Sequence, residues 1–355
     1  MNESQPVFEA PICPLPLRHD DTIVIGHGSG GKMTHDLIKN VFHTHFHNNY
    51  LDQGNDFASV PMPGPNGRLS ISTDGHIVSP LLFPGGDIGR LAICGTVNDM
   101  SMSGATPLYI TASFIMEEGL SVQTLEKIVI SMKTAAEEAG VQIIAGDTKV
   151  VEKGKGDGLF ISTAGIGWIP AQIQIGGNQA QAGDAILLSG SIGDHGIAVL
   201  SARGDLGVVV QIESDVAPLN HLIQSVLKVA PHTHVLRDPT RGGLATTLNE
   251  IAQQSKFGIQ VFEEQIPIRQ PVQAACDLLG FDPLYIANEG KVIVIVPQTE
   301  KEAALHAMQA SPYGEDAIEI GNVTTSHPGR VILKTSLGTN RILDMMAGEM
   351  LPRIC

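Results

Sequence analysis

The chain has 355 residues, of which 43% are hydrophobic and 17% are charged, and its formal net charge at pH 7 is −15. A chain of this length and composition can bury a substantial core in two or more domains, which excludes a disordered protein. The acidic balance argues against nucleic-acid binding, because neutralising phosphates requires clustered Lys and Arg side chains.

The sequence gives no sign of a membrane or secretory role. There is no run of about 18 uninterrupted apolar residues, and the start "MNESQPVFEA" lacks both the basic and the apolar part of a signal peptide. The cysteines Cys13, Cys94, Cys276 and Cys355 stand singly, which fits reduced thiols better than a disulfide framework or a zinc site. We therefore expect a cytoplasmic protein in which Cys94 and Cys276 are small apolar residues of the core.

The first half of the chain alternates predicted strands and helices after an irregular, Pro-rich arm over residues 1–21. The expected elements are a strand over 21–26, a Gly-rich turn and helix over 26–42, a β run ending at Asp74, a helix over 86–103, a strand over 106–116, a helix over 121–139, and strands over 141–147 and 158–169. We interpret residues 22–170 as one domain.

The second half has the same mixed character and follows a polar, turn-rich boundary at 170–184. Its expected elements are a strand over 185–190, a loop over 191–196, helices near 195–204, 215–230 and 270–280, a strand pair over 284–297, and a closing region over 317–335. We interpret residues 171–337 as a second α/β or α+β domain. Residues 338–355 lack an amphipathic repeat and are predicted to form a tail that spans up to about 60 Å when extended.

A Gly-rich loop, "GHGSGGK", precedes the first predicted helix. Backbone N–H groups at Gly28, Gly30 and Gly31 can face phosphate oxygens, and Lys32 adds a positive charge. The spacing is not that of the P-loop. The alternative is a flexible turn, since glycine tolerates conformations that other residues avoid.

Several acidic residues stand where strands end or helices begin, namely Asp74 in "STDG", Asp99 in "VNDMS", Asp147 in "AGDTKV" and Asp238 in "RDPTRGG". Carboxylates at element ends can converge on one cleft, and Mg²⁺ commonly binds one or two of them together with substrate phosphates. For Asp238 the alternative is a helix N-cap, because Asp followed by Pro suits a helix start. Together these residues favour a metal-nucleotide cleft.

Two further residues are candidates for proton transfer or charge stabilisation. Lys149 follows Asp147 by two positions, so both side chains face one side of a strand, where a lysine can stabilise phosphate charge. The alternative is a surface ion pair of little energy. Glu289, in "ANEGK", is expected at a turn between two strands, where the same residues can be simple hairpin chemistry.

Two other features have a chemical and a simpler interpretation. His43 and His47 are spaced to share a helical face as metal ligands can, with His45 between them, but a partly exposed helix face is the favoured interpretation. Cys355 places a thiol on the last residue, where chain ends are usually least ordered. It is either a reactive group on a tether or an accident of the terminus.

The quoted motifs, with "GSIGDHG" and the terminal "PRIC", together resemble the HypE family of hydrogenase maturation factors. This family lies in the superfamily of aminoimidazole ribonucleotide synthetase and selenophosphate synthetase. The resemblance covers residues 22–355 and leaves only the Pro-rich arm outside. Most of the motifs are shared across the superfamily and imply ATP use, whereas "PRIC" separates the maturation factors from the synthetases.

The resemblance implies a two-domain, PurM-like (AIR synthetase-like) fold. An N-terminal α+β domain would bind ATP and pair with its twin through a shared β-barrel, and a C-terminal α/β domain would precede a flexible tail. ATP would lie between the domains, with the Gly-rich loop and Lys32 near the dimer interface. Asp74, Asp99 and Asp238 match the superfamily's Mg²⁺-binding acids, and Asp147 matches less well.

The resemblance also implies an activity. In the family, the carbamoyltransferase HypF places a carbamoyl group on the terminal cysteine, here Cys355, and the factor uses ATP to dehydrate the thiocarbamate to a thiocyanate. The cyano group passes to the HypC–HypD scaffold that carries the iron of [NiFe] hydrogenase. Lys149 and Glu289 match the family's proposed catalytic pair. Two alternatives are a small-molecule synthetase of the same superfamily with an incidental Cys355, and a scaffold that no longer turns over ATP.

Overall fold

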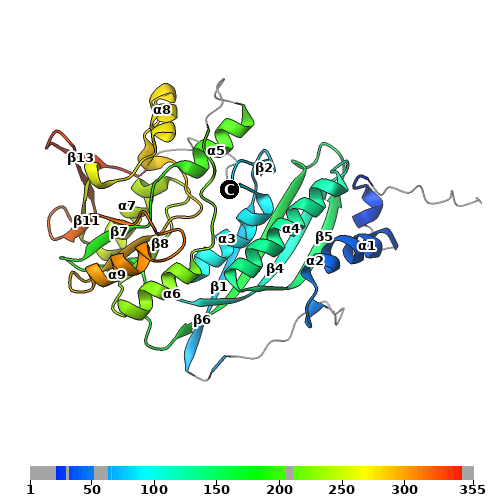
Figure 1. Cartoon of the computed structure of the whole chain (residues 1–355), viewed down its shortest axis with the longest axis horizontal. Coiled ribbons are helices and arrows are strands. Elements are labelled where there is room, and N and C mark those ends of the chain that lie inside the picture. The colour runs from blue at the N-terminus through cyan, green and yellow to red at the C-terminus, as the bar shows by residue number, and fades with distance from the viewer. Residues whose placement is uncertain (1–20, 29–31, 52–62, 65, 205–210, 346–355) are drawn as a thin grey trace, which may run out of the picture.

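The computed structural model describes residues 21–28, 32–51, 63–64, 66–204 and 211–345. Two mixed α/β parts lie side by side, one formed by the first half of the chain and one by the second (Figure 1). Each part has its own sheet, and the strands of the two sheets do not pair with one another.

The N-terminal sheet has four strands in the order β1-β6-β4-β5. Their bounds are Gly67–His76 for β1, Thr106–Glu117 for β4, Gln142–Val151 for β5 and Leu159–Pro170 for β6. The β4–β5 pair is parallel and the other pairs are antiparallel. A parallel pair needs a crossover, which here contains helix α4, Val122–Ala139. The short strands β2, Leu82–Phe83, and β3, Gly86–Asp87, form a separate hairpin before α3, Ile88–Ser101.

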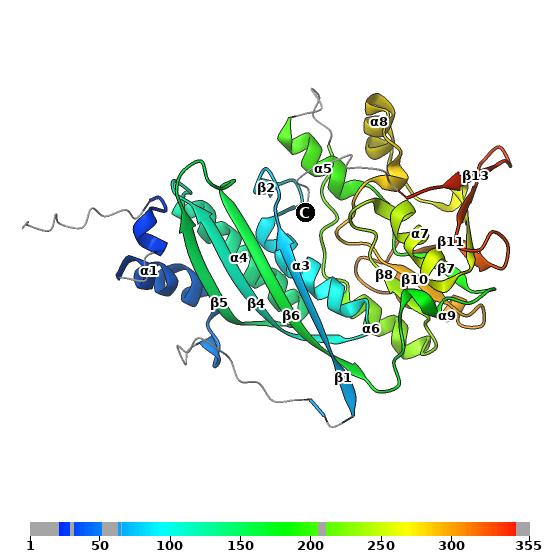
Figure 2. The ribbon, with the colours of Figure 1, turned by 180° about the vertical axis from the view of Figure 1, so that it is seen from behind.

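One face of this sheet is covered and the other is open. Successive side chains of a strand point to opposite faces, so Ile110 and Phe114 of β4 pack under α3 and α4 in the main N-terminal core. Ile115 of the same strand points the other way, with Leu69 and Ile71 of β1, and these three side chains are exposed. Figure 2 shows this open face in front of the two helices.

The predicted strand over residues 21–26 is wrong. Thr22 forms only an isolated bridge with Ser121, and Ile25–Gly28 form the 3-10 helix η1. The backbone N–H of Ile23 donates to Leu120 at 2.6 Å, which ties this segment to the β4–α4 turn rather than to a sheet edge. The helical prediction that follows is confirmed by α1, Lys32–Leu37, the π-helix η2, Ile38–His43, and α2, Thr44–Phe46.

The C-terminal sheet has seven strands in the order β13-β12-β9-β11-β7-β10-β8. Their bounds are Ala185–Leu188 for β7, Val235–Arg237 for β8, Gly258–Phe262 for β9, Ile293–Val296 for β10, Ile318–Thr324 for β11, Val331–Lys334 for β12 and Asn340–Leu343 for β13. The β9–β12 pair is parallel and the other pairs are antiparallel.

Helices cover both faces of this sheet. On one face Ile186 and Leu188 of β7 share a core with α7, Gly243–Ser255. On the other face Ala185 and Leu187 share a core with α6, Asn220–Val229, and α9, Lys301–Gln309. Helices α5, Asp194–Arg203, and α8, Gln270–Leu279, pack together beside the sheet. Three short 3-10 helices complete this part, namely η4, Gly177–Gln179, η5, Glu263–Gln265, and η6, Pro283–Tyr285.

Two predictions for the second half are wrong in part. Of the expected strand pair over 284–297, only β10 forms, because Asp282 accepts a hydrogen bond from the N–H of Leu284 and starts η6 with Pro283 in its first turn. The expected tail from residue 338 begins with β13, whose Leu343 is 2% exposed. Residues 346–355, including Cys355, lie outside the described residues.

The two parts meet along α3 and a segment that crosses from the C-terminal part, residues 211–219. Asn98 of α3 donates from Nδ2 to the carbonyl of Ala217 at 3.0 Å, and the N–H of Ser214 donates to the carbonyl of Pro84 at 2.8 Å. This junction determines which side chains of the two parts face one another. In the described part of the chain, no helix has the length and apolar character to cross a membrane.

Candidate active site

Acidic side chains from both parts of the chain converge at the junction. Asp74 lies near the end of β1 with its side chain toward α3, since a Cβ added at Gly95 would lie 3.2 Å from Asp74 Oδ2. Asp99, on α3, accepts a hydrogen bond from Ser72 Oγ at 2.7 Å. Because β1 alternates, Ser72 and Asp74 face the same side, and Asp238 approaches from the end of β8. The charges of Asp99 and Asp74 act on Asp238, so the three acids lie near one another, and their role as metal ligands stays a prediction.

The charges of these groups act on one another. Desolvation raises the pKa of Asp99, and the nearby Asp74 carboxylate raises it further. Desolvation and the charge of Asp99 raise the pKa of Asp238 to about 7. The pKa of Glu289 lies well above its usual value because of its burial first and the charge of Asp238 next. Since charge interactions weaken with distance, Glu289 belongs to the same cluster.

Glu289 is fixed by its backbone in a buried linker before β10. The residue is 5% exposed, its N–H donates to Asp215 Oδ1 at 3.1 Å, and its carbonyl accepts from Nδ2 of Asn98 at 3.5 Å. Asn98 precedes Asp99 on α3, so one turn of helix contacts Glu289 and carries a member of the cluster. The expectation of a strand-to-strand turn at Glu289 is wrong, because η6 replaces the first strand.

The helix-cap interpretation of Asp238 is also wrong. Helix α7 begins at Gly243, and its N-cap residue is Gly242 with a φ of 77°. That left-handed conformation favours glycine and moves the helix start away from the Asp-Pro pair. Asp238 is thus left beside Asp99 rather than used in a cap.

Asp147 and Lys149 lie elsewhere. Both are exposed on β5, and Lys149 Nζ forms an ion pair with Asp147 Oδ2 at 2.7 Å. Asp147 is in register with Ser113, between Ala112 and Phe114, which are buried on the helix side. The pair therefore faces the open side of the sheet, three strands from β1, whereas Asp74 faces α3. Strand periodicity predicted correctly that the two side chains share a face, but not which face.

The remaining candidates are only partly described. Gly28 ends η1 and Lys32 begins α1, while Gly30, Gly31 and Cys355 lie outside the described residues. Of the three histidines, His43 and His45 are half-buried and His47 is exposed. His45 Nε2 lies 3.6 Å from Glu126. Among the residues with defined positions, no three His, Cys, Asp or Glu side chains form a metal-binding group.

The acidic cluster nevertheless suits a divalent cation that arrives with a nucleotide. Mg²⁺ keeps several waters and commonly uses one or two carboxylates plus phosphate oxygens, so a preformed three-carboxylate cage is not required. Burial raises the pKa values of Asp99 and Asp238, and the neighbouring carboxylates raise them further, so a cation would favour the ionised form of both groups. Asp74, Asp99 and Asp238 therefore have the chemistry to hold Mg²⁺.

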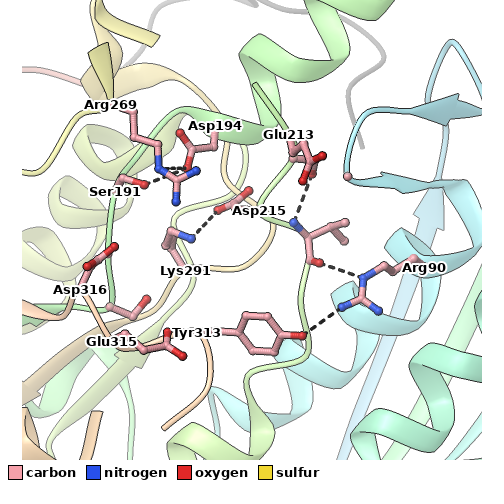
Figure 3. A pocket seen from close by; sticks show the side chains of 15 residues that line it. Arg90, Ser191, Asp194, Glu213, Asp215, Arg269, Lys291, Tyr313, Glu315 and Asp316 are labelled. Atoms are coloured by element: carbon pink, nitrogen blue, oxygen red, sulfur yellow. Dashed lines mark hydrogen bonds and ion pairs between the residues drawn. The ribbon is translucent and has the colours of Figure 1, made fainter. Parts of the chain in front are cut away.

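A polar pocket of about 400 Å³ that we did not predict adjoins the cluster at the domain junction. Figure 3 shows Lys291 and Asp215 in its middle, Arg269 and Asp194 on one side, and Arg90 on the other. Lys291 Nζ lies 3.3 Å from Asp215 Oδ2, and Arg269 Nε lies 3.5 Å from Asp194 Oδ2. Two of the quoted motifs contain residues of this pocket, since Lys291 lies in "ANEGK" and Asp194 in "GSIGDHG".

The class of protein is defined by two matches to family models. Residues 54–169 match the AIR synthase related protein, N-terminal domain, and residues 181–334 match the AIR synthase related protein, C-terminal domain. Thiamine monophosphate kinase of Aquifex aeolicus shares the fold at 20% identity, with a TM-score of 0.56 over 78% of this chain and 90% of that one. The chain thus has the two-domain AIR synthase-like fold.

Within that class, full-length relatives specify the family. The carbamoyl dehydratase HypE of Azotobacter vinelandii is 50% identical over 96% of this chain and 99% of its own length. HypE of Escherichia coli K12 is 43% identical over 94% and 100%. A crystal structure of the hydrogenase maturation protein HypE in complex with ATP superposes with a TM-score of 0.90 at 48% identity, covering 94% of this chain and 100% of that one. The chain belongs to the HypE family of carbamoyl dehydratases.

Proposed function

We propose that the chain dehydrates a carbamoyl group, carried as a thiocarbamate on Cys355, to a thiocyanate that supplies the cyanide ligands of [NiFe] hydrogenase. One observation carries this proposal: Asp74 and Asp99 of one domain meet Asp238 and Glu289 of the other at the domain junction. The names of the relatives and the ATP-bound similar structure support the same reaction.

Dehydration of the thiocarbamate requires its carbamoyl oxygen to become a good leaving group. The oxygen of S–C(=O)–NH₂ attacks the γ-phosphorus of ATP, the bond to ADP breaks, and one nitrogen proton is lost to give a phosphorylated imidate. The C–O bond then breaks, phosphate departs, and the second N–H proton is lost as the C≡N bond forms. The products are S–C≡N, ADP and phosphate, so atoms balance without an oxidant or reductant.

Residues at the junction can serve both halves of this reaction. Asp74, Asp99 and Asp238 would hold Mg²⁺, which offsets charge on the phosphates of ATP. Glu289 would accept a nitrogen proton as the base, since the burial and neighbouring carboxylates that raise its pKa make its ionised form a stronger proton acceptor. The Gly-rich loop with Lys32 would contact the nucleotide.

Lys149 reaches such a site only through an assembly. It lies on the open face of the N-terminal sheet with Leu69 and Ile71, side chains that a second copy would cover. We infer a homodimer joined by this face, in which Lys149 stabilises charge near the interface. Asp147 would then act through its ion pair with Lys149.

The partners follow from the same reaction. HypF would load Cys355, in line with a similar solved structure of a HypE–HypF complex with a TM-score of 0.76 at 49% identity. The HypC–HypD complex would accept the cyano group. Both exchanges place the protein in the cytoplasm, where the chain's single thiols stay reduced.

Mass spectrometry of the loaded chain tests the proposal. After incubation with HypF, its substrates and ATP, the C-terminal peptide should carry a cyano group in place of the Cys355 thiol hydrogen. Cys355→Ala should carry no adduct, and Glu289→Gln should stop at the thiocarbamate. If HypF is active but Cys355 carries no adduct after the incubation, the proposal is contradicted. Unchanged ATP turnover in Cys355→Ala with a soluble substrate would favour a synthetase.

A further inference from the structure

Asp215 contacts the linker that carries Glu289 at two points. Its Oδ1 accepts the backbone N–H of Glu289 at 3.1 Å, and its Oδ2 lies 3.3 Å from Nζ of Lys291. The side chains of Asp215 and Lys291 are 3% and 10% exposed. Because both side chains are largely buried, this ion pair is screened less than an exposed one, and together with the hydrogen bond it contacts the chain on both sides of Gly290.

The segment that carries Asp215 is itself fixed by the N-terminal domain. Nε of Arg90 donates to the carbonyl of Val216 at 3.0 Å, and Nδ2 of Asn98 donates to the carbonyl of Ala217 at 3.0 Å. A Cβ added at Gly290 would lie 1.8 Å from the carbonyl oxygen of Asp215, so the two backbones are in direct contact. A shift of Asp215 would therefore shift the backbone of Glu289.

We propose that Asp215, paired with Lys291, is a positioning residue that fixes the backbone from which Glu289 reaches the carboxylate cluster. This inference rests on the proposed role of Glu289 as the base. Asp215 acts through Glu289 and does not contact the substrate. A base displaced by about 1 Å can cost on the order of 100-fold in rate. Losing Asp215 should therefore lower the rate of dehydration without weakening ATP binding.

The simpler alternative is an ion pair that only stabilises the fold, and two variants of Asp215 separate the two roles. Asp215→Leu keeps the size but removes the acceptor, whereas Asp215→Asn keeps an oxygen that can accept the Glu289 N–H. The rate is measured in single turnover with thiocarbamate-loaded protein and saturating ATP, together with the KM for ATP and the melting temperature.

We expect Asp215→Leu to slow dehydration by about 10- to 100-fold. Asp215→Asn keeps the acceptor for the Glu289 N–H but loses the charge pair with Lys291, so it should recover part of the rate, with the KM for ATP unchanged in both. Asp316→Leu is the matched control, because Asp316 is exposed and lines the same pocket but lies outside the contacts that hold the linker; it should react at the parent rate. A parent rate in Asp215→Leu, an Asn variant as slow as Leu, or a raised KM that explains the loss would overturn the inference.

A second pair keeps the test decisive if Asp215→Leu does not fold. Lys291→Met should slow dehydration and Lys291→Arg should restore it, and equal rates for Lys291→Met and the parent chain would overturn the inference. Glu289→Gln separates this inference from the function on which it rests. If Glu289→Gln reacts at the parent rate, the proposed base is wrong; if it is slow while Asp215→Leu is not, only the positioning role is wrong.

Discussion

Asn98 binds Leu219 across the domain junction: its Oδ1 accepts the backbone N–H of Leu219 at 2.8 Å. The same side chain donates to the carbonyl of Ala217 at 3.0 Å and is 2% exposed. One buried amide therefore satisfies a backbone donor and a backbone acceptor of the other domain. Because Asp99 follows it on α3, the contact that joins the domains also positions the acidic cluster.

Replacing Asn98 with Ala should destabilise the protein. The change leaves the N–H of Leu219 and the carbonyl of Ala217 buried without their partner, and each such group costs about 1–3 kcal/mol. We expect a lower urea midpoint in equilibrium unfolding. Asn178→Ala is the control, because Asn178 is exposed. Equal midpoints for Asn98→Ala and Asn178→Ala would show that the junction does not depend on this amide.

The pKa of Asp238 should make nucleotide-free protein less stable as the pH rises. Its value of about 7 lies above the ordinary 3.8, so between these values the folded state binds more protons than the unfolded state. Stability contributed by this group is then present at low pH and is lost as the pH rises toward 7. Asp238→Asn removes that dependence, so its stability relative to the parent chain should increase from pH 5 to pH 8.

Urea unfolding of both chains at these two pH values, with a chelator present, measures the difference. Other carboxylates titrate in both chains, so only the difference between the pH profiles of the parent chain and Asp238→Asn reports on Asp238. Parallel pH profiles would mean that Asp238 does not titrate in this range. Addition of Mg²⁺ and ATP should reverse part of the loss, since a cation offsets the repulsion from Asp99.

The open face of the N-terminal sheet should control the oligomeric state. Ile71 is 71% exposed on β1, and in a dimer joined by this face a charge at that position would be buried without a partner. Such burial costs several kcal/mol, so Ile71→Asp should weaken self-association by at least about 100-fold. Leu278→Asp is the matched control, because Leu278 is 65% exposed on α8 and far from this sheet.

Sedimentation equilibrium over a range of protein concentrations measures both variants. We expect a monomer for Ile71→Asp and a dimer for Leu278→Asp and the parent chain. A dimer in all three chains would place the interface elsewhere and would leave Lys149 without its proposed role. Circular dichroism confirms that Ile71→Asp remains folded.

Periodicity and turn chemistry predicted most of the helices and strands, because α3, α4 and the long strands of the first sheet follow their hydrophobic patterns. These patterns failed where contacts with other parts of the chain determined the secondary structure. The segment 21–26 has a strand-like sequence but bonds to the β4–α4 turn, and Asp282 starts η6 where a strand was expected. These contacts come from residues distant in sequence or from a local cap that competes with apolar alternation.

The candidate site, too, could be predicted from the sequence only in part. The sequence indicated that Asp74, Asp99 and Asp238 stand at element ends, and the fold brings them together with Glu289. It could not indicate that Asp147 faces the opposite side of the sheet, because the face depends on which side the helices pack. Asp215 was expected at the start of a helix near 215–230, but α6 begins only at Asn220, so the helical pattern could not predict its contacts with Glu289 and Lys291.

Gly290→Ala should show whether the position of the linker backbone affects the rate when no polar group is changed. A Cβ at Gly290 would lie 1.8 Å from the carbonyl oxygen of Asp215, a contact that only a backbone shift can relieve. Since the shift moves Glu289, dehydration should slow by about 10-fold or more. In Gly190→Ala the new Cβ would meet Lys291 Cε at 3.5 Å, an ordinary contact, so this control in the same pocket should react at the parent rate. Comparable single-turnover rates for the two variants would show that the linker tolerates the shift and that Glu289 needs no such exact placement.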